Sequence, residues 1–326
     1  MSTNPRDAVS SAYLAASKKA ESERKIVSYI TDMLREQFPD ENIYPQKVRY
    51  WLKSLDHQGV RKALDEGAKV LTIDIETAPT RAFIWRLFKE NIPIQRIIQE
   101  GYILCVCAKF LGDAKILSTA LPDFDSFKED LTYDKHVIAE ARSWLDEADA
   151  IVAHNGNGFD IPTLNYGMFR HGLAPPSPYK KIDTLRAAKR SFRSPSNKLD
   201  WLTQVNGQKG KIGTDWALWD GCMNGDLEAW EKMVTYCKQD VTELEEFYLS
   251  MRPWIPNHPN LSVYTDCTDP QCTTCLSTNI SPAPDVVTST IKYPGFRCNE
   301  CGTHLRGRVN SSTKEKKAAT LSRSIL

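Results

Sequence analysis

The sequence predicts an α/β protein in which a mixed β-sheet is flanked by helices, with a small helical region before it and a cysteine-rich module after it. Short apolar runs alternate with stretches of helical periodicity between residues 69 and 254. Five of the nine cysteines lie between residues 267 and 301. The length of 326 residues allows more than one domain. We expect a flexible N-terminus (1–23), a helical region (24–68), the sheet domain (69–254), the cysteine module (262–308) and a basic flexible tail (309–326).

The helical region begins with an amphipathic face formed by Ile26, Val27, Ile30, Met33 and Leu34. Its later segment, with basic and aromatic residues at positions 47–51, is compatible with a DNA-binding helix-turn-helix. The helices are equally compatible with a cap that packs on the sheet domain or docks a partner, and we prefer this interpretation.

The start of the chain is charged throughout and lacks the apolar core of a signal peptide or membrane span. We therefore expect a cytoplasmic protein with no membrane partner. In a reducing compartment the cysteines are better interpreted as thiols or metal ligands than as disulfides. We expect packing roles for Cys105, Cys107, Cys222 and Cys237, which lie in apolar or helical surroundings.

The first strand of the sheet domain is predicted at residues 70–76, where the apolar run "VLTI" leads into Asp74, Ile75 and Glu76. Side chains alternate in a strand, so Asp74 and Glu76 project to the same face about 7 Å apart at the backbone. This spacing suits the joint ligation of a cation. Alone, a D-x-E after an apolar run is weak support, because it often marks an ordinary strand end.

The next two strands are predicted in "YILCVCAKF" and "AKILSTAL", and a helix in "KHVIAEARSWLDEAD" leads to a further strand at residues 151–153. A glycine-rich turn, "HNGNG", then precedes a helix that begins near Asp160. Asp160 could simply cap that helix. A substrate-facing loop explains more of the segment, because Asn155, Asn157 and Phe159 offer amide and ring contacts to a nucleic-acid strand.

A long helix is predicted over residues 227–249 from apolar residues at helical spacing. Tyr236 and Asp240 are four residues apart, so they lie on one side of this helix and can reach the same site. Exposure among other helix charges would be the simpler interpretation of either residue taken singly.

The order D-x-E, N-x3-F-D, Y-x3-D resembles the DEDD exonucleases, the DnaQ-like family of polymerase proofreading domains, in their tyrosine-bearing DEDDy subclass. The resemblance covers Asp74 to Asp240, and "YILCVCAKFLG" and "IDTLRAAKRSF" are similar to segments of phage-encoded members. It implies an RNase H-like fold in which Asp74, Glu76, Asp160 and Asp240 hold two divalent ions and Tyr236 orients the attacking water. His154 belongs to the second motif and does not replace the tyrosine.

The chemistry follows from the residue types as well. Hydrolysis of a phosphodiester needs an activated water and relief of phosphate charge, which two cations about 3.5–4 Å apart supply. Oxygen ligands select Mg²⁺ or Mn²⁺. Clustered acids repel one another without bound cations. A metal cage is therefore the expected reason for their convergence.

A basic segment from Lys180 to Lys211 contains nine basic residues and two acids, a net charge of +7, whereas the whole chain has a net charge of only +1. This pattern suits a phosphate backbone led towards the acids. We expect Arg190, Arg193 and Lys198 to contact nucleic acid. An exposed charged helix is the alternative.

Two C-x2-C pairs, Cys272 with Cys275 and Cys298 with Cys301, are spaced to bind one structural Zn²⁺ across a hairpin and resemble a zinc ribbon. The segment between them has few large apolar residues, so a metal would supply its folding energy. Unligated thiols or an iron–sulfur cluster are the alternatives. Cys267 could replace Cys272 as a ligand, although the symmetric pairing argues against it.

The expected function is a metal-dependent 3′–5′ exonuclease that acts on DNA, preferably single-stranded, and releases nucleoside 5′-monophosphates. Polarity and product are implied by the resemblance, as is a replication or recombination protein acting as a partner in trans. The alternatives are an exoribonuclease or structure-selective endonuclease of the same fold, and a non-catalytic nucleic-acid-binding module.

Overall fold

The computed structural model describes residues 23–41, 43, 48, 67–207 and 213–322. Its centre is a five-stranded mixed sheet in the order β5-β4-β1-β6-β7. The middle strand β1 pairs antiparallel with β4 and parallel with β6, β4 pairs antiparallel with β5, and β6 pairs parallel with β7. The strands are β1 (Val70–Thr77), β4 (Ile103–Phe110), β5 (Leu117–Ala120), β6 (Ala150–Ala153) and β7 (Lys180–Asp183). The three predicted consecutive strands and the helix–strand alternation that follows them are confirmed.

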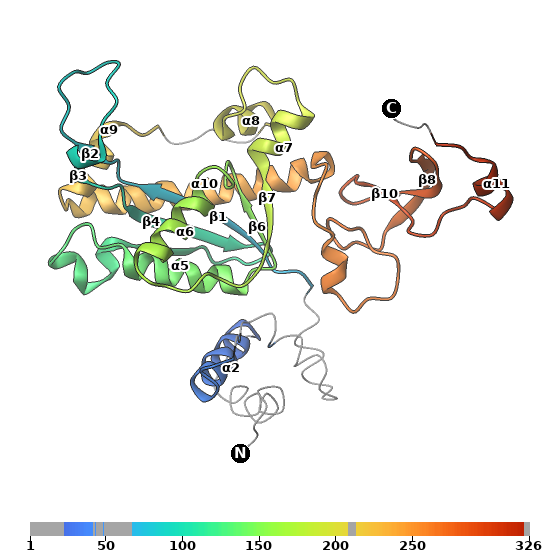
Figure 1. Cartoon of the computed structure of the whole chain (residues 1–326), viewed down its shortest axis with the longest axis horizontal. Helices are drawn as coiled ribbons and strands as arrows, with labels where there is room; N and C mark the ends of the chain where they lie inside the picture. The colour runs from blue at the N-terminus through green and yellow to red at the C-terminus, as the bar shows by residue number, and fades with distance from the viewer. Residues whose placement is uncertain (1–22, 42, 44–47, 49–66, 208–212, 323–326) are drawn as a thin grey trace.

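The helices around this sheet include the long α10, which runs along it, and the neighbouring pair α5 and α6 (Figure 1). One apolar cluster joins β1, β4, α5, α6 and the first half of α10, and a second joins β6, β7, α7, α8 and the last turns of α10. The predicted helices at 135–149, near Asp160 and at 227–249 are confirmed. The helices are α5 (Lys135–Glu147), α6 (Asp160–Arg170), α7 (Thr184–Ser191), α8 (Leu199–Val205), α9 (Trp216–Met223) and α10 (Leu227–Met251).

Between β1 and β4 the chain forms a small antiparallel hairpin that sequence patterns did not predict. Single-turn helices occur within or beside several loops. The hairpin strands are β2 (Arg81–Ala82) and β3 (Ile97–Gln99), and the short 3-10 helices are η1 (Ile94–Arg96), η2 (Leu121–Asp123), η3 (Asp125–Lys128), η4 (Arg252–Trp254) and η5 (Leu261–Tyr264).

The C-terminal part forms a separate three-stranded antiparallel sheet in the order β10-β9-β8. These strands are β8 (Ile280–Val287), β9 (Lys292–Cys298) and β10 (His304–Arg306), and the helix α11 (Lys314–Ala319) follows them. The four predicted packing cysteines, in contrast, lie in the main domain and are all buried there.

The N-terminal helix α2 (Glu23–Gln37) buries Val27, Ile30 and Leu34, as its amphipathic pattern predicts. Its Arg35 guanidinium lies 3.7 Å from the Asp146 carboxylate of α5, so the end of α2 contacts the main domain. The cap interpretation stays a prediction. The segment at 47–51 proposed for DNA contact lies largely outside the described residues. Among the described helices, none combines the length and apolar character that a membrane span requires.

The partly buried His258, in the segment after α10, should make the folding stability of the protein depend on pH. The Pro259 carbonyl can only accept, so Nδ1–H donates to it, and Nε2 accepts from the Tyr248 hydroxyl, both at 2.8 Å. Burial lowers the pKa of His258 to about 4, and the Arg252 charge adds to the effect. Because the unfolded chain binds a proton below pH 6.5 and the folded chain does not, folding stability is complete above pH 6.5 and falls as the pH drops towards 4.

We expect this loss to reach about 3 kcal/mol of unfolding free energy near pH 4. Denaturant unfolding of wild type and His258→Gln across pH 4–7.5 would measure it, because the difference between the two removes the contribution of the carboxylates. A difference that does not change with pH would contradict the prediction.

Candidate active site

Strand β1 carries two acids at the end of a buried segment. Leu71, Ile73 and Ile75 point into the apolar cluster, whereas Asp74 and Glu76 share the opposite parity and face. The pairing register with β4 shifts between Glu76 and Thr77, so the regular ladder ends directly after the second acid. The predicted shared face of Asp74 and Glu76 is therefore present in the strand.

Helix α10 brings a third carboxylate to this face. Asp240 is buried, and its carboxylate oxygen lies with one oxygen of Asp74 and one of Glu76 in a group whose atoms are all within 4.8 Å of one another. The thiol of Cys237, one turn earlier on α10, lies 3.6 Å from the Asp74 carbonyl oxygen. These three residues, Asp74, Glu76 and Asp240, are called the acid cluster below.

Asp160 lies outside the group defined by the 4.8 Å distance, although its carboxyl contacts the backbone of strand β1. It is the first residue of α6, and the capping position is taken by Phe159, whose side chain makes no capping hydrogen bond. Burial raises the pKa of Asp160 to about 7 and the nearby Asp183 charge adds to this, although hydrogen bonds from the backbone N–H groups of Asp160 and Ile75 oppose it. The Ile75 contact places the carboxyl against β1 between the two acids of that strand.

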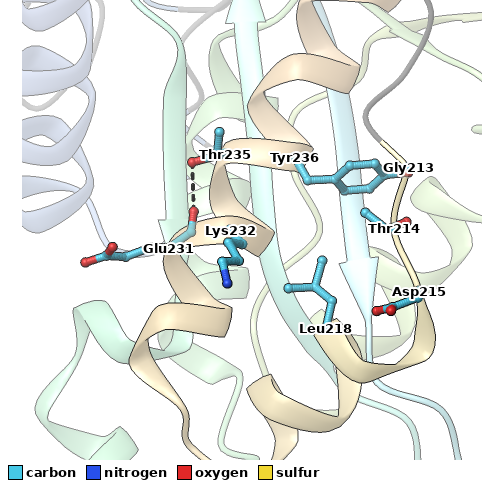
Figure 2. A pocket seen from close by; sticks show the side chains of 8 residues that line it. All are labelled: Gly213, Thr214, Asp215, Leu218, Glu231, Lys232, Thr235 and Tyr236. Carbon is cyan, nitrogen blue, oxygen red and sulfur yellow. Dashed lines mark hydrogen bonds between the residues drawn. The ribbon is translucent and has the colours of Figure 1, made fainter.

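Tyr236 lies one turn before Asp240 on α10 and lines a cavity of about 580 Å³. Figure 2 shows its ring extending from α10 towards the segment Gly213–Thr214. Its edge contacts Trp219 of α9, with ring centroids 6.4 Å apart. The ring is therefore positioned between α10, α9 and the chain that leads into α9.

The glycine-rich loop between β6 and α6 is shaped by Asp183, at the end of β7. Its carboxylate accepts hydrogen bonds from the backbone N–H groups of Asn155 and Asn157, at 3.3 and 3.0 Å. Gly156 is required by packing, because a Cβ there would lie 2.5 Å from the Cβ of Ala153. The loop geometry thus comes from internal contacts, and the two asparagines lie within it.

A cleft of about 560 Å³ opens beside Asp74. Lys198, predicted to contact nucleic acid, lines it together with Lys189. Arg190 and Arg193 are exposed but are not among its lining residues. Phe159 lines a different cavity, of about 350 Å³, with Thr77 and Thr80 at the end of β1. The predicted contact residues are therefore divided among separate surfaces.

His154 connects the acid-bearing sheet to this basic cleft. Its Nε2 lies 2.9 Å from the Asn197 carbonyl, which can only accept, so Nε2–H donates, and its Nδ1 lies 2.9 Å from the Thr184 hydroxyl. The imidazole therefore holds the residue before Lys198 against the end of β6. Both ring nitrogens are thus engaged in contacts that position the loop.

Sequence reasoning missed three residues of this region, Lys189, Asn197 and Asp183. Lys189 was one of the nine basic residues of the segment, and its position five residues after the start of α7 is what turns it into the cleft. Asp183 carried a helix-start signal, since its side chain accepts from the Arg186 N–H at the beginning of α7. No local pattern marks Asn197.

The C-terminal cysteines form a second candidate metal centre. One Sγ from each of Cys272, Cys275, Cys298 and Cys301 lies within 4.8 Å of the others. The Sγ pairs Cys272–Cys301 and Cys275–Cys298 are 3.6 and 3.5 Å apart. A tetrahedral ion with metal–sulfur bonds of about 2.3 Å needs sulfur–sulfur distances of about 3.8 Å, so the four thiols fit such an ion after a small expansion.

The two knuckles of this cluster share a backbone feature. The residue after each pair has a left-handed backbone, with φ of 66° at Leu276 and 78° at Gly302. Burial acts to raise the pKa of Cys301, but hydrogen bonds with Thr303 and with the neighbouring thiols outweigh it and lower the pKa to about 7. Cys267 is exposed and lies outside the cluster, which agrees with the symmetric pairing predicted from the sequence.

The acid cluster also fits divalent cations by the chemistry of its donors. Its members offer only carboxylate oxygens, which are hard ligands preferred by Mg²⁺ and Mn²⁺, and a bound cation would offset the repulsion between like charges this close. Asp74, Glu76 and Asp240 are the residues that could hold such ions, and Asp160 lies close enough to the strand to contribute.

Comparison with known proteins supports the fold and leaves the subclass open. No curated protein matches the chain in sequence. The RNase_H_2 family model, described as RNase_H superfamily, matches residues 116–251, from the start of β5 to the end of α10. The matched stretch contains Asp160, Tyr236 and Asp240. Together with the mixed sheet order, this match identifies an RNase H-like domain in the protein, followed by a C-terminal four-cysteine cluster.

Proposed function

We propose that this protein is a metal-dependent 3′–5′ exonuclease that hydrolyses DNA, preferably single-stranded, to nucleoside 5′-monophosphates. An RNase H-like domain indicates a role in nucleic-acid processing. The single observation that carries the proposal is the acid cluster, with three carboxylates within 4.8 Å at the end of β1 and Asp160 against the same strand. Polarity and product follow from the resemblance to DEDDy exonucleases.

In this proposal Asp74, Glu76, Asp160 and Asp240 hold two Mg²⁺ or Mn²⁺ ions. Bound ions of this kind acidify water and offset charge on the phosphate and the leaving oxygen. The side chains of the protein bind the nucleic acid and orient it. Lys189 and Lys198 attract the phosphate backbone into the cleft beside Asp74, because their charges oppose those of the phosphates. Phe159 lines the cavity at the end of β1, where its exposed ring is available to a base.

The role proposed for Tyr236 is to orient the attacking water by a hydrogen bond. A tyrosine hydroxyl has a pKa near 10 and stays protonated near neutral pH, so it positions water and does not act as a strong base. Its place one turn before Asp240 allows both side chains to serve one site. The edge contact with Trp219 restricts the ring.

Tyr236→Phe should therefore reduce the rate of hydrolysis by about 10²-fold, because misplacement of a reactant by about 1 Å costs that much. Affinity for Mn²⁺ measured by calorimetry should be unchanged. Tyr248→Phe, which removes a hydroxyl from the same helix further along, should leave the rate within about twofold at a temperature well below unfolding. A wild-type rate for Tyr236→Phe would remove the tyrosine from the mechanism.

The direct test of the function follows 5′-labelled single-stranded DNA and RNA of the same sequence in Mg²⁺. A ladder that shortens from the 3′ end supports the exonuclease, and faster loss of DNA than RNA supports the sugar preference. Faster loss of RNA would favour an exoribonuclease, since the acids act on phosphates and not on the sugar. Internal cuts would favour an endonuclease. Intact strands that nevertheless shift in a gel would favour a binding module.

We further propose that the four-cysteine cluster binds one structural Zn²⁺ and forms a zinc ribbon. The thiol spacing and the left-handed residue after each pair support this assignment. The main domain binds its ions through oxygen and this module through sulfur, so the two centres would select different metals.

A further inference from the structure

The hairpin between β2 and β3 exposes an unusual density of apolar side chains. Eight large ones between residues 83 and 98 are exposed, and Trp85 and Phe88 are 83% and 81% exposed. Soluble proteins seldom expose so many adjacent apolar groups without a binding role. The eight are Phe83, Ile84, Trp85, Leu87, Phe88, Ile92, Ile94 and Ile98.

Internal contacts give this loop a defined shape. The Glu90 carboxylate accepts hydrogen bonds from the backbone N–H groups of Trp85 and Arg86, at 2.9 and 2.8 Å, and pairs with the Arg96 guanidinium. The Phe83 N–H donates to the Arg96 carbonyl at 3.0 Å. The rings are therefore presented from an ordered loop, which lowers the entropy lost when they bind a partner.

Basic residues alternate with the rings. Residues 81–96 carry a net charge of +3, from the four basic residues Arg81, Arg86, Lys89 and Arg96 and the single acid Glu90. The Glu90 carboxylate is already bonded within the loop. Arg86 and Lys89 are exposed. Aromatic faces interleaved with cations match the chemistry of unpaired bases on a phosphate backbone.

The loop is also attached directly to the acid-bearing strand. Only four residues separate Glu76 from Arg81, a span of at most about 17 Å. The Ala78 N–H donates to the Tyr102 carbonyl at 2.9 Å and the Gly101 N–H to the Thr80 hydroxyl at 3.2 Å, so the stem is held to the chain that enters β4. The loop extends beyond the end of the central sheet (Figure 1).

We infer that residues 81–96 form a second nucleic-acid contact, in which Trp85 and Phe88 stack on unpaired bases and Arg86 and Lys89 contact phosphates of the strand whose end enters the acid cluster. This inference rests on the proposed function for the identity of the substrate. Because stacked nucleotides advance about 3.4 Å each, the span from Glu76 to Arg81 corresponds to at most about five of them. A 16-mer exceeds this span, whereas a stacked 3-mer covers about 10 Å of it.

The test measures binding of fluorescein-labelled oligothymidylates of 16 and 3 nucleotides by anisotropy, in an Asp74→Asn background that prevents hydrolysis. Adding Trp85→Ala and Phe88→Ala should weaken binding of the 16-mer at least tenfold and leave the 3-mer unchanged. Phe169→Ala is the matched control, because Phe169 is 82% exposed on α6. A 16-mer affinity within twofold of the parent would overturn the inference.

Two further measurements separate this inference from its competitors. A 16-mer that contains 5-iodouracil should crosslink to the peptide that carries Trp85, and labelling confined to other peptides would count against the inference. If the parent is a dimer and the double variant a monomer with unchanged DNA affinity, the hairpin joins two copies of this chain and the inference is wrong. Binding is measured without hydrolysis, so the two proposals can fail separately. If wild type does not hydrolyse DNA but the double variant still binds the 16-mer more weakly and the 3-mer equally well, only the proposed exonuclease activity is refuted.

Discussion

Replacing Asp74 by Asn is expected to reduce kcat/KM for DNA hydrolysis by at least about 10³-fold. The substitution keeps the shape of the side chain but removes one of three charges within 4.8 Å of one another. Loss of metal-based charge stabilisation of several kcal/mol, about 4, corresponds to that factor. Rates of release of nucleoside monophosphate from labelled DNA, measured with saturating Mg²⁺, would provide the value.

The same substitution should not destabilise the fold in the absence of divalent ions. Asp74 lies on the face of β1 that carries Glu76, and Asp240 approaches the same point, so one fewer charge relieves repulsion. We expect a melting temperature equal to or above that of wild type without divalent ions, and a smaller rise when Mn²⁺ is added.

Asp113→Asn provides the control for this prediction. Asp113 is exposed and follows β4 at the end of the sheet opposite the acid cluster, since Phe110 pairs with Leu71. It should keep wild-type activity and the wild-type response to Mn²⁺. Full hydrolysis by Asp74→Asn would show that the reaction takes place elsewhere in the molecule.

Periodicity predicted the strands and helices whose own residues show a regular repeat of apolar side chains. Strand β1 and helix α10 have clear periods, and the register of Asp74 with Glu76 and the spacing of Tyr236 with Asp240 follow from those periods alone. These local regularities are why the acid cluster could be anticipated before any tertiary contact was known. The convergence of β1 and α10 did not follow from these periods and was expected only from the resemblance of the three ordered motifs to the DEDD exonucleases.

Elements stabilised by neighbours were not predictable in the same way. Strand β7 contains two lysines and is exposed at its first two residues, so its place in the sheet depends on parallel pairing with β6. Helix α7 is short, and its cap Asp183 also organises the distant loop at 155–157. The cleft beside Asp74 combines residues more than 100 positions apart, which no local pattern encodes.

The charge pattern of the sequence indicated that a basic surface lies beside the acids, but it did not indicate which basic residues line the cleft. Of the three basic residues chosen from the +7 segment, Lys198 lines the cleft, whereas Arg190 and Arg193 do not. Lys209 and Lys211 lie outside the described residues. A net charge reports an attraction averaged over a surface, and the particular cation that faces the acids is decided by how α7 and α8 pack.

The largest structural effect should follow loss of a thiol from the four-cysteine cluster. Between residues 262 and 322, all of which the structure describes, the buried side chains other than cysteine are limited to Thr274, so this module has no apolar core. Structural zinc contributes about 10–16 kcal/mol to the folding of such modules. Removing one of four ligands should therefore unfold the module.

Cys298→Ser tests this, because Cys298 is fully buried and ends strand β9. Wild type purified without chelator should contain about one zinc per chain by elemental analysis, and the variant far less. Limited proteolysis should then cut the variant within residues 262–308 while the main domain resists. Cys267→Ser should behave as wild type, because that thiol is exposed and outside the cluster. Equal zinc in wild type and Cys298→Ser, or none in wild type, would show that the four thiols do not hold the metal and that another interaction stabilises the β8–β10 sheet.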